Sequence, residues 1–307
     1  MKVYEPALQL LISNSGLLVT REQFMSAILR FAPSSWVDDD FEPKTYHQEA
    51  HEEMLRVTSQ SKVLLSDSFS DNMPAGTLAY HRIRGIILSD SRWTFSSKDF
   101  ELNLLAAEAN ENIFGHFIHI SSGGGEAWYL DRVSETLSSL KKPVYTLIDQ
   151  VCASAAYYIG CHGSVVAALT QNDCIGSIGT MVYAMDFTPY YKKLGINFIE
   201  EYATKSTLKN KKHNDLLAGK PDQYIEEELD PLQVQFEKVV RASRSALANL
   251  PEDHPVFAGE TYSAILAVEN GLIDKIVTLP EALEAAAKAG EQWAKQQKQK
   301  KAISFIH

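Results

Sequence analysis

The 307-residue sequence has few cysteines and no excess of positive charge. Its three cysteines, Cys152, Cys161 and Cys174, form no C-x-x-C pair, and their number is odd. A disulfide framework or a zinc site is therefore not expected, and a reducing compartment fits better. The formal net charge of −10 argues against general nucleic-acid binding. We expect no metal, no cofactor and no nucleic-acid partner.

The sequence also lacks a long apolar run. No segment approaches the roughly 18 consecutive apolar residues that a membrane-spanning helix needs. Near the N-terminus, Glu5 stands where an export signal would be basic. Together these absences predict a cytoplasmic protein without a membrane span, or one packed into an assembly that forms in the cytosol.

What is present is organised around residues 149–160, which read D-Q-V-C-A-S-A-A-Y-Y-I-G. The apolar run Pro143–Ile148 before them predicts a buried strand, and the small residues then predict a tight turn into a helix. At such a turn a hydroxyl is exposed, a substrate backbone can come close, and the helix N-terminus favours developing negative charge. Ser154 is therefore a candidate nucleophile. Alternatively, Ser154 is only the N-cap of a buried helix, or the thiol of Cys152 is the nucleophile.

Three regions differ in composition. Residues 1–75 predict a helical N-terminal segment, residues 76–285 the main domain, and residues 286–307 a polar, basic tail. The main domain alternates strand-like and helix-like segments, which predicts βαβ units and a parallel sheet covered on both faces. The expected elements are a strand or hairpin at Thr77–Leu88, a helix at Phe100–Asn110, a strand at His116–Ile120, a helix at Ala127–Leu140, strands at Pro143–Ile148 and Ser164–Leu169, and helices at Pro231–Asn249 and Thr261–Asn270.

The N-terminal segment carries its own helix signals. A capping-box spacing at Thr20–Gln23 precedes an apolar helix face over Phe24–Phe31, and His47–Val57 predicts a further helix. His47 and His51 lie one turn apart beside two glutamates. Without an H-E-x-x-H pattern they indicate a solvated polar face rather than a metal site.

A glycine triplet, Gly123–Gly125, follows one predicted strand and precedes a helix. It lacks the G-x-G-x-x-G spacing of a nucleotide-binding turn. It is either a plain tight turn or an oxyanion hole, in which backbone N–H groups point at a developing negative oxygen. Because the carboxyl ends of parallel strands meet at one edge of a sheet, we expect this turn and Ser154 to lie at the same edge.

A serine nucleophile needs a base, and the residues leave the choice open. Downstream of Ser154 lie two histidines and a lysine-rich segment. A lysine can act as a general base only where burial lowers its pKa toward ~7–8. The candidates are His162, His213, Lys205, Lys209, Lys211 and Lys212.

Four motifs follow one another in a distinctive order: S-S-G-G-G at Ser121–Gly125, A-S-A-A-Y-Y at Ala153–Tyr158, I-G-S-I-G-T at Ile175–Thr180, and a G-x-x-x-x-A…G-L-I-D close over Gly259–Asp274. This set resembles the S49 family of serine peptidases, related to signal peptide peptidase A. The corresponding family motifs are N-S-P-G-G, A-S-G-G-Y-Y, T-G-S-I-G-V and G-x-x-A-x-x-x-G-L-x-D. The resemblance covers roughly residues 76–280. It implies the ClpP/crotonase-like α/β fold, with repeated ββα units around a parallel sheet.

By this resemblance Ser154 is the nucleophile of a Ser–Lys dyad. The family's lysine lies in an S-G-x-H-K-D stretch after a strand of G-I-x-apolar pattern, which Leu194–Ile199 resembles. The stretch K-S-T-L-K-N that follows overlays best and places Lys209 on the dyad lysine. Lys205 and Lys211 are the next candidates, because the usual glycine and histidine are absent.

The resemblance also implies supporting roles. The amides of Gly124 and Gly125 are the expected oxyanion donors, and Ser177 is expected to support the lysine or the substrate. Ala155 and Ala156 replace the two glycines that follow the nucleophile in the family, and a glycine replaces the proline of the turn. Because alanine suits a helix better than glycine, these changes need not harm the helix start.

The family has two branches that fit differently. One clears cleaved signal peptides and has an N-terminal membrane anchor; the other comprises the soluble head-maturation proteases of tailed phages, which carry a helical N-terminal segment. We expect the second type: a serine endopeptidase that cuts capsid or scaffold proteins, in the cytoplasm or within an assembling prohead. The expected partners are a peptide or protein substrate and further copies of the chain in a homo-oligomeric ring.

Three other functions stay open at this point. The chain could be a cytosolic peptidase of the signal-peptide-peptidase type, or an assembly scaffold without activity. It could also be a crotonase-type acyl-CoA enzyme, which would need an acid–base carboxylate near the glycine turn. Glu126 is the one good candidate for that carboxylate, and it more readily starts a helix, where a negative charge is favourable.

Overall fold

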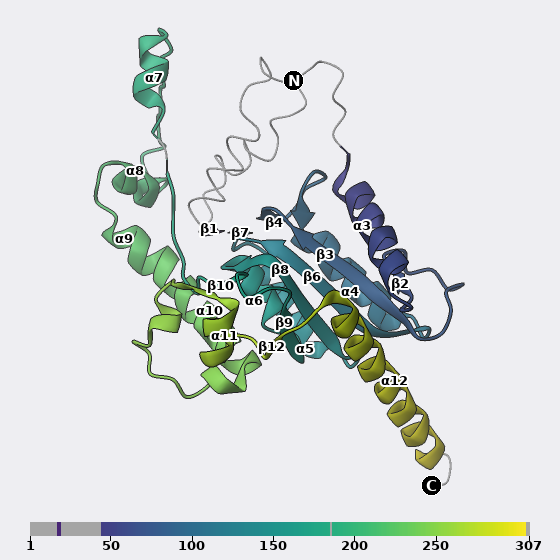
Figure 1. Cartoon of the computed structure of the whole chain (residues 1–307). Helices are drawn as coiled ribbons and strands as arrows, with labels where there is room; N and C mark the ends of the chain where they lie inside the picture. Colours follow the sequence, from purple (N-terminus) through teal and green to yellow (C-terminus); the bar gives the residue numbers. More distant parts are fainter. Residues whose placement is uncertain (1–16, 20–43, 185, 305–307) are drawn as a thin grey trace.

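A large, mostly parallel sheet forms the centre of the computed structural model, which describes residues 17–19, 44–184 and 186–304 (Figure 1). The strand order is β11-β10-β8-β6-β3-β2, and β9 joins β8 and β12. Every strand pair of this sheet is parallel except β10 with β11. Its strands are β2 (Leu65–Ser66), β3 (Thr77–Arg84), β6 (Ile113–Ser122), β8 (Val144–Ala153), β9 (Val165–Ala168), β10 (Cys174–Gly176), β11 (Thr261–Ser263) and β12 (Lys275–Ile276).

A second, smaller sheet stands at the carboxyl ends of the large one, in the order β1-β7-β4-β5. Its strands are β1 (Leu17–Val19), β4 (Ile87–Leu88), β5 (Phe95–Ser96) and β7 (Gly124–Glu126). The chain passes twice from the large sheet into the smaller one. Strand β4 follows β3 after two residues, and β7 follows β6 after one residue. The segment Thr77–Leu88 is therefore two strands of different sheets and not a hairpin.

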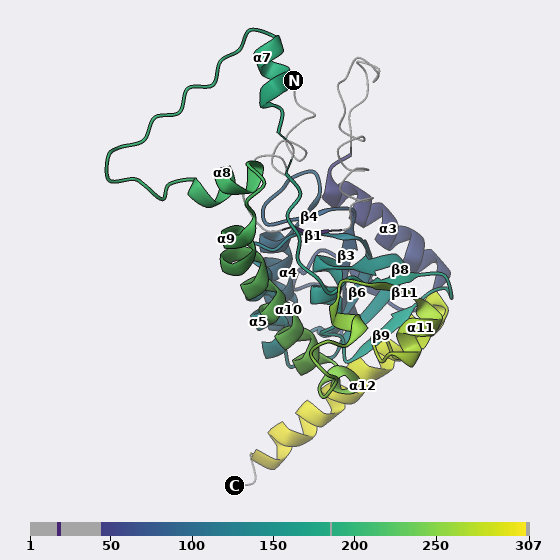
Figure 2. The ribbon, with the colours of Figure 1, turned by 90° about the vertical axis from the view of Figure 1, so that its left-hand side faces the viewer.

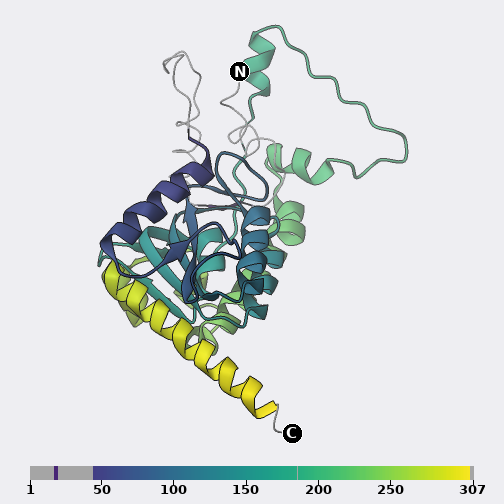
Figure 3. The same cartoon turned by 90° about the vertical axis from the view of Figure 1, so that its right-hand side faces the viewer.

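Helices cover both faces of the large sheet, which confirms the predicted α/β fold. Successive side chains of a strand point to opposite faces, so Ile118 on β6 packs into one core and its neighbour Phe117 into the other. Figure 3 shows α3 and α12 on one face and α4 and α5 on the other. The helices of the first core are α4 (Ser97–Ala109), α5 (Leu130–Ser139), α6 (Ala155–Gly160), α10 (Asp230–Ser243) and α11 (Ala264–Glu269), and those of the second are α3 (Tyr46–Gln60) and α12 (Leu279–Ser304).

Helix α3 begins at a capping box, in which Thr45 and Gln48 each accept the other's backbone N–H. It buries Met54 and Val57 against the sheet. This is the helix predicted at His47–Val57. The predicted capping box at Thr20–Gln23 and the helix after it lie outside the described residues.

Helix α12 runs without a break to Ser304, and the predicted boundary between residues 285 and 286 falls inside it. Its first turns bury Ala282, Leu283 and Ala286 on the sheet, while its far end projects from the body (Figure 1). Farther along the helix Gly290 still lies directly against Phe114 of β6, and the mostly exposed part of the helix begins after Ala294.

An arm leaves the body between residues 186 and 220 (Figure 2). It contains the short helices α7 (Thr188–Lys193) and α8 (Lys211–Leu217), and it returns through α9 (Asp222–Tyr224) and a π-helical turn (Ile225–Leu229) into α10. The strand predicted at Leu194–Ile199 was wrong, because Leu194 ends α7 in a turn and residues 196–199 have no regular structure. Many large apolar side chains of the arm are exposed, among them Phe187, Tyr190, Leu194, Phe198, Ile199 and Leu208. Within the described residues no helix is both long and apolar enough to cross a bilayer.

Candidate active site at the carboxyl edge of the sheet

Ser154 lies at the junction between β8 and α6, in a backbone conformation that side-chain-bearing residues rarely adopt. Its φ is 56° and its ψ is −123°. Two backbone hydrogen bonds hold it there: its N–H donates to the Gly176 carbonyl at 2.9 Å, and its carbonyl accepts from Tyr158 N–H at 2.9 Å. Strain of this kind costs ~1–3 kcal/mol and persists only where the surroundings impose it.

The side chain of Ser154 does not cap the helix, because its oxygen accepts no hydrogen bond from α6. The N-cap interpretation therefore gives no reason for a serine at this position. The residue is almost fully enclosed, with 1% of its surface exposed. A strained serine between a buried strand and a helix matches the geometry by which nucleophile elbows present a hydroxyl.

Helix α6 is short and buried throughout, which fixes the position of Ser154. Ala155 and Ala156 are completely buried, so the methyl groups that replace the expected glycines fill core space. A Cβ at Gly160 would come within 2.9 Å of Ile120 Cδ1, so the helix lies close against β6. The Tyr157 hydroxyl donates to the Leu272 carbonyl at 2.7 Å and ties the helix to the C-terminal part of the domain.

The glycine turn lies beside the strand that leads to Ser154, as predicted, since Ser122 at the end of β6 pairs with Cys152 on β8. Gly124 has φ +106°, which favours glycine. Gly125 is required for a different reason: a Cβ there would lie 1.9 Å from the Ile87 carbonyl oxygen of β4. The two glycines therefore bring β7 directly against β4.

The amide of Gly124 has a partner within the turn. It donates to Ser122 Oγ at 3.1 Å, and that hydroxyl donates to the Gly85 carbonyl at 2.6 Å. A further donor stands closer to the serine in sequence. Ala155 is the first residue of α6, so its N–H has no acceptor within the helix. Sequence reasoning missed this amide, although the position after a nucleophile is a recurrent oxyanion donor.

Glu126 does not start a helix, contrary to expectation. It belongs to β7, is 6% exposed, and its carboxylate accepts the Ser89 backbone N–H at 2.8 Å. Helix α5 begins four residues later, at Leu130. This carboxylate therefore links β7 to the residue that directly follows β4.

The candidate lysines lie on the arm, away from Ser154. Lys205 and Lys209 are exposed in irregular segments, and Lys211 pairs with Asp215 at the start of α8. Among the described residues, no lysine amine forms a hydrogen bond with the Ser154 hydroxyl. Within one chain the structure thus brings together the serine and the glycine turn and leaves the predicted base apart.

The predicted supporting serine, Ser177, follows β10 directly. Its φ is 52°, and its N–H donates to the Glu260 carbonyl at 2.7 Å. It comes one residue after Gly176, whose carbonyl holds the Ser154 backbone. Ser177 therefore neighbours the nucleophile through the backbone.

His162 is not placed to assist Ser154. Its Nε2 lies 3.0 Å from Ser134 Oγ on α5, and its Nδ1 lies 3.4 Å from Ser243 Oγ on α10. Burial lowers the pKa of this imidazole to about 4. The other histidine candidate, His213, lies on α8 of the arm.

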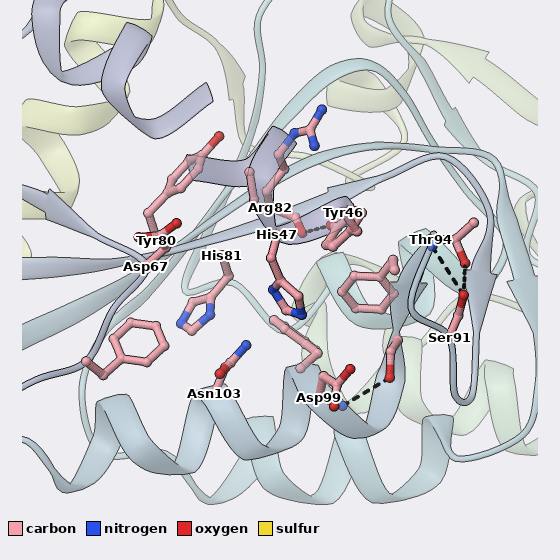
Figure 4. A pocket seen from close by; sticks show the side chains of 15 residues that line it. Tyr46, His47, Asp67, Tyr80, His81, Arg82, Ser91, Thr94, Asp99 and Asn103 are labelled. Carbon is pink, nitrogen blue, oxygen red and sulfur yellow. Dashed lines mark hydrogen bonds between the residues drawn. The ribbon is translucent and has the colours of Figure 1, made fainter. Parts of the chain in front are cut away.

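A polar cavity of about 230 Å³ opens on the α3 face, next to the same sheet edge. There His119 Nε2 lies 3.7 Å from a carboxylate oxygen of Asp149, and burial lowers the pKa of His119. Its lining also includes the residues Glu53, Arg56, Arg82, Arg84, Ser121 and Gln150. A second pocket, between α3, β3 and α4, contains none of the predicted catalytic residues (Figure 4).

The described part of the chain holds no cluster of three or more histidine, cysteine or acidic side chains suited to a metal ion. His47 lines the pocket of Figure 4, and His51 Nδ1 lies 3.6 Å from Asp67. The two histidines thus have separate neighbours.

Two comparisons bear on the whole arrangement. The family described as Peptidase family S49 matches residues 136–293, just over half of the chain, which include Ser154 and the arm. A curated protein of Enterococcus faecium, whose name describes it as a signal peptide peptidase, SppA, is 26% identical over 207 residues. The match covers 64% of this chain and 57% of that protein, so the chain spans little more than half of this relative's length.

Proposed function

The chain belongs to peptidase family S49, and on this premise we propose that it is a serine endopeptidase in which Ser154 and a lysine of the arm form the catalytic dyad. The observation that carries the proposal is the backbone of Ser154, held at φ 56° between β8 and α6 beside a glycine turn. A purely structural residue at this position would be a glycine, because glycine adopts positive φ at little cost.

In the proposed reaction Ser154 Oγ attacks a peptide carbonyl carbon and passes its proton to a neutral lysine. The Ala155 N–H and an amide of Gly124 or Gly125 stabilise the oxyanion, where one donor is worth ~3–4 kcal/mol of barrier. The Gly124 N–H now donates to the Ser122 hydroxyl. The substrate oxygen therefore has to displace that hydroxyl before Gly124 can act as an oxyanion donor. The lysine then protonates the leaving amine, and water hydrolyses the acyl-enzyme with the same lysine as base.

The base is proposed to come from the arm, with Lys209 as the first candidate and Lys205 and Lys211 next. A lysine acts as a base only where burial lowers its pKa, and in a single chain these three side chains are exposed. The arm also exposes large apolar side chains, including Phe198 and Leu208, and a surface of this kind marks an interaction site. We therefore propose that the arm of one copy packs over Ser154 of a neighbour within a homo-oligomeric ring.

The proposed substrate is an extended peptide that adds as a strand to the smaller sheet. The proposed role is maturation of capsid or scaffold proteins of a phage type. The name of the Enterococcus faecium relative supports a second role, the degradation of signal peptides. An acyl-CoA reaction has less support, because the one suitable carboxylate, Glu126, already binds the Ser89 amide.

Casein hydrolysis by purified chains tests the dyad. Ser154→Ala is expected to lower kcat by at least a thousandfold. Replacing the lysine that serves as the base by alanine should have the same effect. Lys209→Ala is tested first, and Lys205→Ala and Lys211→Ala are measured beside it. Lys192→Ala, on α7 of the same arm, is the matched control and should retain activity.

Mixing the inactive serine and lysine variants then tests whether the dyad is shared. If serine and lysine come from different copies, the mixture regains activity that neither variant has alone. Full activity of Ser154→Ala would refute the serine mechanism. Turnover of acyl-CoA without peptide hydrolysis would favour the crotonase-type reaction instead.

A further inference from the structure

The polar cavity on the α3 face lies where three neighbouring strands change from apolar to charged side chains. Farther from the carboxyl edge, this face of the sheet carries Tyr80, Phe117 and Leu147, which belong to the second core. Residues two apart on a strand share a face. At the next position on that face the three strands carry Arg82 on β3, His119 on β6 and Asp149 on β8. These side chains line the cavity of about 230 Å³.

Arg82 and His119 are buried, and each has a nitrogen without a partner. They are 7% and 6% exposed, and Arg82 Nη1 and His119 Nε2 form no hydrogen bond with any residue that the structure describes. A carboxylate oxygen of Glu49 lies 3.6 Å from Arg82 Nη1, beyond hydrogen-bond distance. Figure 4 shows the Arg82 guanidinium and the Tyr80 hydroxyl extending to the same side, away from the pocket drawn there. Because a buried charge is unfavourable without a partner, the cavity needs an acceptor.

The surroundings of His119 make its free nitrogen a donor. Burial lowers the pKa of the ring, so near neutral pH it carries a single N–H. A carboxylate oxygen of Asp149 lies 3.7 Å from Nε2 and favours the proton there, and the Tyr80 hydroxyl then donates to Nδ1 over 3.1 Å. The cavity therefore presents two N–H donors, one of them charged.

These two donors suit a carboxylate. Arg82 and His119 are paired residues of adjacent strands, and such strands lie ~4.8 Å apart, so their side chains can bind the two oxygens of one carboxylate. Charge-assisted bonds of this kind are among the strong hydrogen bonds of proteins. The lining also contains Asp149 and Glu53, and Glu53 is paired with Arg56. Two acidic groups in the lining favour a ligand with one negative charge over a dianion such as phosphate.

Asp149 also indicates what stands beside that carboxylate. A ligand carboxylate on His119 Nε2 would lie next to the like charge of Asp149, which is unfavourable unless a cation separates them. In an α-amino acid the ammonium group is attached to the carbon that bears the carboxylate, so it can reach Asp149. The exposed residues Arg84 and Gln150 stand at the same cavity, which leaves an open side for the rest of the ligand.

We propose that this cavity binds a free α-amino acid as a zwitterion, with its carboxylate on Arg82 and His119 and its ammonium group on Asp149. The cavity is separate from the helix that follows Ser154. Helix α6 packs in the first core, on the opposite face of the sheet from α3. The inference therefore does not depend on the proposed peptidase function.

Ligand-detected NMR titration of the full-length chain tests the proposal with four probes. L-Alanine is compared with propionate, which lacks the ammonium group, with ethylamine, which lacks the carboxylate, and with inorganic phosphate. L-Alanine should bind saturably and about tenfold more tightly than each of the others. Saturable binding of propionate or phosphate as tight as that of L-alanine overturns the proposal. So does the absence of saturable L-alanine binding, which means that water alone fills the cavity.

Variants locate the binding. Arg82→Gln should weaken L-alanine and propionate about tenfold, and Arg132→Gln, on α5 of the opposite face, is the matched control that should bind as the wild type does. Asp149→Asn should make L-alanine and propionate bind equally. Because the Asp149 side chain is 37% exposed, this variant decides the question even where Arg82→Gln fails to fold. Unchanged preference for L-alanine in Asp149→Asn overturns the proposal.

Discussion

Replacing Gly125 by alanine tests whether the glycine turn is held by close contact between β7 and β4. The added Cβ would lie 1.9 Å from the Ile87 carbonyl oxygen and 2.7 Å from its carbonyl carbon and nitrogen. Real Cβ atoms keep at least about 3.0 Å from such atoms. These neighbours are backbone atoms of a paired strand, so no side-chain rotation can relieve the overlap. One of the two strands has to move by about 1 Å.

The size of the effect follows from that displacement. Overpacking of a buried site costs ~1–3 kcal/mol, and more where backbone must shift, so we expect Gly125→Ala to lose about 3 kcal/mol of unfolding free energy. Its effect on catalysis should be larger than this figure suggests. A misplacement of ~1 Å in a catalytic group can lower the rate a hundredfold, and the turn carries the proposed oxyanion amides.

Urea unfolding and casein hydrolysis measure the two effects separately. The control is Gly85→Ala in the β3–β4 loop, where φ is +73° but no atom lies within 4 Å of the added Cβ. It bears only the backbone strain, ~1–2 kcal/mol, and should retain most activity. If Gly125→Ala is as stable and as active as the control, the contact between β7 and β4 does not position the site.

Two further changes probe the supporting core. Burial lowers the pKa of His162 to about 4. Between about pH 6.5 and 4 the unfolded chain therefore binds a proton at this residue and the folded chain does not. The free energy of unfolding consequently decreases as the pH falls through that range. Urea midpoints at pH 7.5 and 5 should therefore show that the wild type loses about 2 kcal/mol more than His162→Asn, and equal losses would contradict this. Tyr157→Phe leaves the buried Leu272 carbonyl without its 2.7 Å donor and should cost ~1–3 kcal/mol in thermal unfolding, with no change expected in kcat at a temperature where both proteins are folded.

The sequence predicted the large sheet well because its central strands are long and apolar. It also placed Ser154 and the glycine turn at one edge, since both follow parallel strands. The smaller sheet was not visible, because strands of two or three residues, such as β4 and β7, show no periodicity. The Gly124 amide could not be assigned to Ser122 from sequence either, since that bond depends on how the turn is folded.

The two halves of the proposed dyad differ in how far one chain can define them. Ser154 is fixed by contacts from three directions: β8 before it, α6 after it and the Gly176 carbonyl beside it. Its position therefore follows from the fold, and the alanines that replace the expected glycines fit because they are helical and buried. Lys209 has no such contacts, since its segment is exposed and irregular. A base with a lowered pKa needs a surrounding that excludes water, and the exposed apolar side chains of the arm can provide it only when they pack against another surface.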